Sequence, residues 1–179
     1  MKIVVSACLM GESCKYNGLD NYHRALVEAC ERTGTEVLLV CPEVFGGLPT
    51  PRKPSEIVNG EVLTCEGTSV DREFRLGAQR AFDMCEQAGG PEEIAACILQ
   101  DRSPSCGAGH IYDGTFSGTL TAGNGVFVDL LLRHGYRVIP ASEFTPACWS
   151  NKKPPQRCLS PLWWFWARPR ACGRRRWRP

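Results

Sequence analysis

The stretch "IAACILQDRSPSCG", residues 94–107, decides the fold, because it joins an apolar run directly to a cysteine in a tight turn. "IAACILQ" (94–100) is short and uncharged, which predicts a buried strand. Buried strands that alternate with helices form parallel sheets, and functional loops lie at the carboxyl ends of such strands. The turn "DRSPSCG" (101–107) is therefore a predicted functional loop.

Five more segments continue the alternation of strands and helices. The runs "KIVVSA" (2–7) and "TEVLLVCPE" (35–43) predict two further buried strands. Residues 21–34 and 69–90 have the apolar spacing of amphipathic helices, and residues 123–140 predict a turn, a helix and a last strand. We therefore expect an α/β fold, a single Rossmann-like three-layer domain with a mostly parallel sheet.

The middle of the chain is predicted to be less regular. "GLPTPRKPSEIVNGE" (47–61) contains three prolines and two glycines, which predicts a loop of defined path. "EVLTCEG" (61–67) predicts a short edge strand after it.

Composition places the protein among ordinary globular domains. The chain has 179 residues, of which 43% are hydrophobic and 22% charged. No apolar run reaches the roughly 20 residues that a membrane-spanning helix needs, and the first residues turn polar too soon for a signal peptide. We expect a cytoplasmic protein. In that reducing compartment, the eleven cysteines favour metal binding or thiol chemistry over a disulfide framework.

Three cysteines follow predicted strands. Cys8, Cys41 and Cys106 each lie at or just after the end of an apolar run. Because the carboxyl ends of parallel strands meet at one edge of the sheet, these thiols are expected to converge. Cys14 also lies in a turn. The remaining cysteines of the body are expected to pack in the core or to have no role: Cys30, Cys65, Cys85 and Cys97.

The chemistry of these thiols has several interpretations. A zinc site would favour closely spaced CxxC pairs, which the chain lacks, and the close cysteine run of a ferredoxin is also absent. An iron–sulfur cluster assembled from dispersed loops fits, and three ligands would leave one iron open for substrate. Alternatively, these cysteines are simply tolerated beside Gly and Pro. A nucleophilic Cys106 lacks a convincing base, because His110 is near it only in sequence.

Neighbouring residues fit a catalytic pocket. Glu43 could act as a general acid or base, or be a solvated loop carboxylate. Ser103 and Ser105 could donate hydrogen bonds to a ligand or to cluster sulfur, or merely form the turn. Arg52 could bind an anion or be solvated. Glycines such as Gly107 would let the backbone approach a ligand closely.

Several of these stretches together resemble a known family. They are "SACLMGESCKYNG" (6–18), "CPEVFGGLPTPRKPSEI" (41–57), "RSPSCG" (102–107) and "IYDGTFSGTLTAGNGV" (111–126). The chain is similar in order, from residue 3 to about residue 140, to domain-of-unknown-function family 523. Within that family, the resemblance to thiouracil desulfidases implies a [4Fe-4S] cluster on three cysteines. It also implies removal of sulfur from thiolated pyrimidines without net redox change, with the open iron taking the substrate sulfur and water supplying the oxygen.

The resemblance assigns roles motif by motif. It implies three cluster ligands: Cys8, Cys41 and Cys106. Cys14 is an auxiliary candidate, because relatives often carry valine there. Glu43 and Ser103 become the acid–base and substrate-positioning candidates, with Ser105 a weaker option.

These assignments predict an enzyme, a cluster-dependent desulfidase whose partner is a small thiolated nucleobase. The alternative is an iron–sulfur or zinc carrier without catalysis, whose function would survive replacement of Glu43 by Gln. Nothing in the sequence indicates a membrane partner or an oligomeric state.

The C-terminal end departs from the family pattern. Residues 147–179 hold nine Lys or Arg, no acid and all five tryptophans, whereas residues 1–146 carry a net charge of −7. We expect an α/β domain over 1–146 and a basic Trp- and Pro-rich tail over 147–179, disordered or foreign to the family, as a shifted reading frame would produce. Basic residues mixed with tryptophan also suit nucleic acid, but composition alone does not make it an expected partner.

Overall fold

A four-stranded parallel sheet lies at the centre of the computed structural model, which describes residues 1–147. Its order is β2 (Glu36–Val40), β1 (Lys2–Ser6), β5 (Ile94–Leu99) and β8 (Val138–Pro140). The two central strands are the β-branched and apolar runs whose burial the sequence predicts. The expected α/β class is confirmed.

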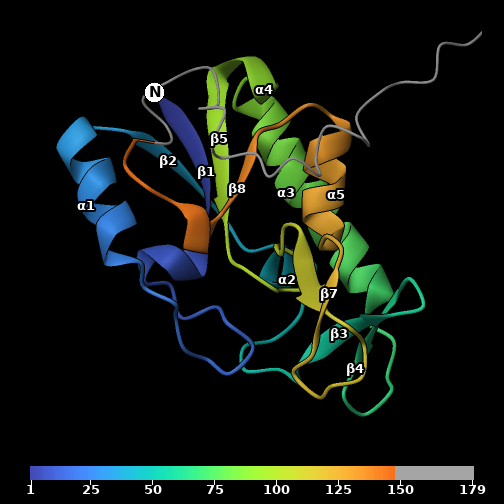
Figure 1. Cartoon of the computed structure of the whole chain (residues 1–179). Helices are drawn as coiled ribbons and strands as arrows, with labels where there is room; N and C mark the ends of the chain where they lie inside the picture. The colour runs from blue at the N-terminus through green and yellow to red at the C-terminus, as the bar shows by residue number, and fades with distance from the viewer. Residues whose placement is uncertain (148–179) are drawn as a thin grey trace, which may run out of the picture.

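Helices cover both faces of this sheet (Figure 1). Helix α1 (Arg24–Thr33) lies on one face, and α3 (Asp71–Gln87) and α5 (Val126–Arg133) lie on the other. Successive side chains of β1 point to opposite faces: Ile3 packs with the α1 side and Val4 with the α3 and α5 side. The sheet is therefore the middle layer of three.

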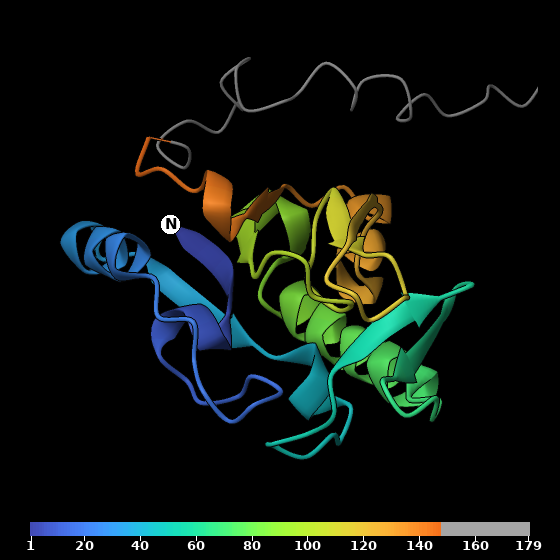
Figure 2. The same ribbon diagram turned by 60° about the horizontal axis from the view of Figure 1, so that its bottom comes forward.

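Shorter elements surround the carboxyl end of the sheet. They are the helix α2 (Pro42–Phe45), the 3-10 helices η1 (Ala7–Met10) and η2 (Ala141–Glu143), and two antiparallel hairpins, β3 (Ser55–Val58) with β4 (Glu61–Thr64) and β6 (His110–Tyr112) with β7 (Leu120–Ala122). The short helix α4 (Gly90–Glu93) lies at the opposite end, where it leads directly into β5. Figure 2 shows the loop after β1, helix α2 and the β3–β4 hairpin gathered at the same end of the molecule.

Some expectations for the secondary structure were wrong. Strand β2 is an edge strand rather than a buried one, and Leu39 is 36% exposed. The predicted loop over residues 47–61 contains β3, which pairs with β4. Helix α2 and the β6–β7 hairpin lack the periodicity that would reveal them, since each strand of that hairpin has only three residues.

Two glycines set the position of α2. A side chain on Gly77 of α3 would place a Cβ atom 1.7 Å from the carbonyl oxygen of Pro42, and one on Gly46 would lie 2.1 Å from the carbonyl oxygen of Glu73. Both distances are far inside van der Waals contact, so only glycine fits at these positions. This packing holds α2, and the residues around its start, against α3.

None of the helices within residues 1–147 combines the length and the apolar character needed to span a bilayer. The chain from residue 148 onward, which contains nearly all of the expected tail, lies outside the described residues.

Candidate functional site

A cavity of about 400 Å³ opens at the carboxyl ends of the parallel strands. Its wall includes six of the candidate residues from the sequence: Cys8, Cys14, Cys41, Glu43, Ser103 and Cys106. Ser105, the weaker candidate, does not line it. The strand order reverses beside β1, which lies between β2 and β5. Such a reversal is where open α/β sheets form their ligand crevices, and the volume lies within the usual range for ligand pockets.

Three of these thiols lie just after the ends of three different strands. Cys8 lies in η1 immediately after β1, Cys41 directly follows β2 and begins α2, and Cys106 lies in the turn after β5. The side chains of Cys8 and Cys106 are buried, whereas that of Cys41 is half-buried. All cysteines within residues 1–147 are free thiols.

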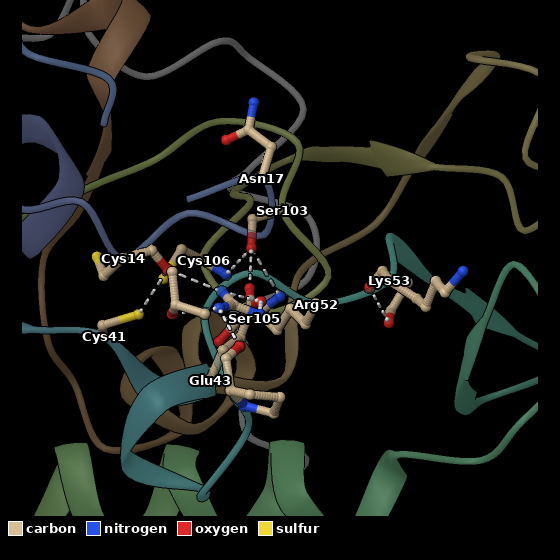
Figure 3. Close-up of polar contacts among 12 residues, drawn as sticks. Cys14, Asn17, Cys41, Glu43, Arg52, Lys53, Ser103, Ser105 and Cys106 are labelled. Atoms are coloured by element: carbon tan, nitrogen blue, oxygen red, sulfur yellow. Dashed lines mark hydrogen bonds and ion pairs between the residues drawn. The ribbon is translucent and has the colours of Figure 1, made fainter. Parts of the chain in front are cut away.

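Cys14 extends this group of thiols. The Cys41 thiol lies 3.9 Å from the carbonyl oxygen of Cys14 (Figure 3). The Cys41 thiol lowers the pKa of the Cys14 thiol, but the neighbouring Cys8 thiol and burial outweigh it and raise that pKa to about 11. A hydrogen bond with Cys14 and burial likewise raise the pKa of Cys41 well above its ordinary value. Both shifts in pKa favour the protonated thiols of Cys14 and Cys41.

The environment of Cys106 argues against a cysteine nucleophile. Burial raises the pKa of its thiol to about 12, against the smaller opposing effect of a hydrogen bond from Ser6. A nucleophilic cysteine needs a lowered pKa and a nearby base. The sequence candidate for that base, His110, is exposed on β6 and does not line the cavity.

The donor arrangement suits a cluster better than a single ion. Within residues 1–147, no three His, Cys, Asp or Glu side chains are grouped so that they could hold one metal ion. A structural zinc site would require such a tetrahedral group. The thiolates of a [4Fe-4S] cluster each bind a different iron, so they need not meet at one point. Soft sulfur donors on a cavity wall fit that group, and its positive irons would offset the burial that disfavours thiolates.

A largely buried carboxylate lies beside the thiols. Glu43, in the first turn of α2, receives a hydrogen bond of 2.7 Å from Nε of Arg52 on its Oε2 atom, and Nη2 of Arg52 lies 2.6 Å from the same atom. The other oxygen, Oε1, accepts a hydrogen bond of 3.3 Å from Ser103 (Figure 3). The sequence left two alternatives for Arg52, binding an anion or being solvated. Neither holds, because its charge is paired with Glu43.

The same polar network ties together the loops that carry the thiols. Nη2 of Arg52 donates a hydrogen bond of 3.0 Å to the carbonyl oxygen of Cys14. The Ser103 hydroxyl accepts hydrogen bonds from the backbone N–H groups of Ser105 and Cys106, at 3.0 and 3.2 Å. Ser103 therefore both shapes the cysteine turn and contacts Glu43.

The glycines near the site serve a different purpose from the one expected. A Cβ atom on Gly107 would lie 2.7 Å from the carbonyl oxygen of Ser103, and one on Gly125 would lie 2.4 Å from the carbonyl oxygen of Ser105. The protein backbone, and not a ligand, makes these close approaches. They pack the cysteine turn tightly against the start of α5.

Glu56 is a wall residue that the sequence analysis missed. It is only 7% exposed, and its Oε2 atom accepts hydrogen bonds from the backbone N–H groups of Gly114 and Phe116 at 2.9 and 3.0 Å. It thereby fixes the loop between β6 and β7, and both Glu56 and Gly118 of that loop line the cavity. The only sequence signal was an acidic residue within the short strand β3, next to Ile57, which a solvated strand face would also show.

Known proteins are similar to this chain in sequence and in fold. The family model described as 2-thiouracil desulfurase matches residues 3–143. The uncharacterized protein YbbK of Bacillus subtilis (strain 168) is 36% identical, over 79% of this chain and 96% of its own length. The solved structure of the [4Fe-4S]-dependent thiouracil desulfidase TudS (DUF523Vcz) is similar with a TM-score of 0.73 and 41% identity, covering 80% of this chain and 92% of that one.

Proposed function

Since the chain belongs to the 2-thiouracil desulfurase family, we propose that it is a [4Fe-4S]-dependent desulfidase acting on small thiolated pyrimidines. The reaction replaces a thiocarbonyl by a carbonyl. Water supplies the oxygen, the carbon–sulfur bond breaks, and sulfur leaves as hydrogen sulfide, so no atom is oxidised or reduced.

The proposed cluster ligands are Cys8, Cys41 and Cys106. They are supported by their origin in three separate strand-end loops that share one cavity wall. When bound, the cluster would supply an iron with an open coordination position, a Lewis acid for the thiocarbonyl sulfur. Cys14 is proposed as an auxiliary thiol that shapes the wall without being required as a ligand.

Glu43 is the proposed general base and acid. Arg52 holds one oxygen of its carboxylate, so the other oxygen, which contacts Ser103, is the one directed toward a reactant. That oxygen can take a proton from water as the water attacks the thiocarbonyl carbon, and can return it to the departing sulfur. Ser103 is proposed to position Glu43, or the substrate, through its hydroxyl.

The observation that carries the proposal is the juxtaposition of three buried or half-buried thiols with this arginine-paired carboxylate on one cavity wall. A carrier protein would need the thiols but would have no use for a buried Glu43–Arg52 pair beside them. The enzyme is therefore favoured over the carrier. We also place it in the cytoplasm, where thiols stay reduced.

Anaerobic purification and reconstitution test the proposal. The protein should be brown, bind about four irons and as many sulfides per chain, and release sulfide and uracil from 2-thiouracil. Cys106→Ser should lose the iron, whereas Cys65→Ser, which changes an exposed thiol outside the cavity, should keep it. A colourless protein without iron after reconstitution would refute the proposal. A loaded protein that releases no sulfide from any thiolated pyrimidine would leave only the carrier role.

A further inference from the structure

Ser105 carries an unusual hydroxyl group. Its residue is 0% exposed, and its Oγ atom is the only buried side-chain nitrogen or oxygen within residues 1–147 that has no hydrogen-bond partner. Leaving a buried polar group unpaired is costly, so such an atom calls for an explanation.

The backbone prevents this hydroxyl from moving to water. The N–H group of Ser105 donates to Ser103, and its carbonyl oxygen accepts a hydrogen bond of 3.0 Å from the N–H group of Phe127. Gly125 packs directly against the same carbonyl group. Ser105 also differs from Ser103 and Cys106, its neighbours in the turn, because it does not line the cavity. Its hydroxyl is therefore unavailable to a substrate.

The sulfur of Cys106, the next residue in the turn, is the neighbouring polar atom that this hydroxyl can reach. A neutral thiol is a weak acceptor, and in this form the hydroxyl makes no hydrogen bond to it. A thiolate or a metal-bound sulfur is a stronger acceptor, because hydrogen bonds to ionised groups are shorter and roughly twice as strong.

A second hydroxyl approaches the same sulfur from another strand. Ser6, at the end of β1, is 3% exposed and lies on the cavity wall. Its Oγ atom accepts a hydrogen bond of 3.0 Å from the N–H group of Gln100, so its own proton is free to be donated. Ser6 therefore supplies a second buried hydroxyl proton on the wall that also carries Cys106.

We propose that the hydroxyls of Ser6 and Ser105 form a two-donor seat for the Cys106 sulfur in its ligating form. This inference rests on the proposed function, because it concerns the sulfur that binds the cluster. Both are positioning residues, because each acts through the Cys106 sulfur that would bind the cluster. The hydroxyl of Ser105 is then unpaired because its acceptor, the Cys106 sulfur, becomes a strong acceptor only when it carries negative charge.

The variant Ser105→Ala tests the seat, because it should act in opposite directions on the two forms of the protein. In the cluster-free protein it removes a buried unpaired hydroxyl, so unfolding in urea should need the same or a higher denaturant concentration than in the wild type. In the loaded protein it removes a hydrogen bond to a charged sulfur, so iron loss to a chelator should be roughly tenfold faster. The reduction potential of the cluster should also become more negative.

Two further variants complete the experiment. Ser6→Ala should shift the potential and the iron loss of the loaded protein in the same directions, but it should destabilise the cluster-free protein, because Gln100 loses its acceptor. The matched control is Ser55→Ala, which removes a hydroxyl from the same cavity wall where it contacts only the carbonyl oxygen of Lys53. It should leave the potential and the iron loss unchanged.

Three results would count against the seat. If Ser105→Ala binds iron as firmly as Ser55→Ala and has the wild-type potential, the seat is wrong while the proposed function stands. If Ser105→Ala clearly destabilises the cluster-free protein, the hydroxyl already has a partner there and the seat is also wrong. A wild type that binds no iron overturns the proposed function, and this inference with it.

Discussion

Arg52 and Glu43 form an ion pair in which Nη2 lies 2.6 Å from Oε2, and their side chains are only 8% and 16% exposed. The pair connects helix α2 to the loop that carries Cys14, because the same Nη2 atom donates to the Cys14 carbonyl oxygen. Removing one member of a buried pair leaves an uncompensated charge, which is more harmful than removing both. The site therefore depends on a residue that itself carries no proposed catalytic role.

Arg52→Met should destabilise the cluster-free protein by about 1–3 kcal/mol, because it leaves the largely buried carboxylate of Glu43 without its charged partner. Urea unfolding under anaerobic conditions measures this. The double variant Arg52→Met/Glu43→Gln should recover part of the loss, since it removes the charge from both partners. Unfolding of Arg52→Met at the wild-type urea concentration would contradict the prediction.

Glu43→Gln should lower kcat for sulfide release by about 10²–10⁴-fold, the usual contribution of a general acid–base residue, while the iron content stays at the wild-type level. The matched control is Glu56→Gln on the same wall. Two backbone N–H groups donate to one oxygen of Glu56, and the amide oxygen of glutamine can accept both hydrogen bonds. The kcat of Glu56→Gln should therefore change little. Equal losses in the two variants would indicate a general effect of charge in the cavity instead.

Cys14→Val should keep most of its iron, whereas Cys8→Ser should lose it, if Cys14 is auxiliary and Cys8 a ligand. Valine is close to cysteine in size and fills the half-buried position without a sulfur donor. Iron and sulfide analysis of the anaerobically reconstituted variants measures the difference. Loss of iron from both variants would make Cys14 a required ligand.

Gly77→Ala should destabilise the protein and lower its iron content together. The new methyl group would overlap the carbonyl oxygen of Pro42 and push α2, with Cys41 and Glu43 around its start, away from α3. Leu76→Ala on the same helix is a suitable control, because Leu76 is 41% exposed. Thermal unfolding measures the loss of stability, and iron analysis measures the loss of iron. A normal iron content in Gly77→Ala would show that iron binding does not depend on the position of α2.

Stability should fall at alkaline pH because of a thiol far from the cavity. Burial raises the pKa of Cys85 to about 12, whereas an unfolded cysteine titrates near 8.5. The stabilisation of the neutral thiol is fully present below the unfolded pKa and is lost as pH rises toward the folded pKa. Each such thiol contributes a slope of about −1.4 kcal/mol per pH unit in that range.

The unfolding free energy of the cluster-free protein, measured between about pH 9 and pH 11, checks this. Cys85→Ala should show a shallower slope than the wild type, even though its cavity lowers the stability at every pH. Cys65→Ser, which changes an exposed thiol, should keep the wild-type slope. Identical slopes in all three proteins would disprove the assignment to Cys85.

Periodicity predicted the elements whose side chains face the core on a regular repeat. Helices α1 and α3 were found this way, because their apolar residues recur at helix spacing. Strands β1 and β5 were found as short continuous apolar runs. The edge position of β2 was missed, since an apolar run does not report how many neighbours a strand has. The β6–β7 hairpin was missed because six residues paired by backbone hydrogen bonds leave almost no pattern in the side chains.

The sequence likewise predicted some features of the candidate site and not others. That loops after parallel strands would share one edge follows from topology, and the cavity does lie there. The pairing of Arg52 with Glu43 arises from the path of a proline-rich loop, which residue types alone do not specify. The different surroundings of Ser103 and Ser105 also depend on which way each side chain points within one tight turn.

The strand order has a consequence for the life of the protein in the cell. Cys8, Cys14 and Cys41 leave the ribosome early, but Cys106 reaches the cavity only after β5 has been made and inserted between β1 and the later β8. An iron donor that arrives during synthesis would find an unfinished binding site. We therefore expect cofactor insertion to be a late step, carried out on a chain that is already folded and still fully reduced.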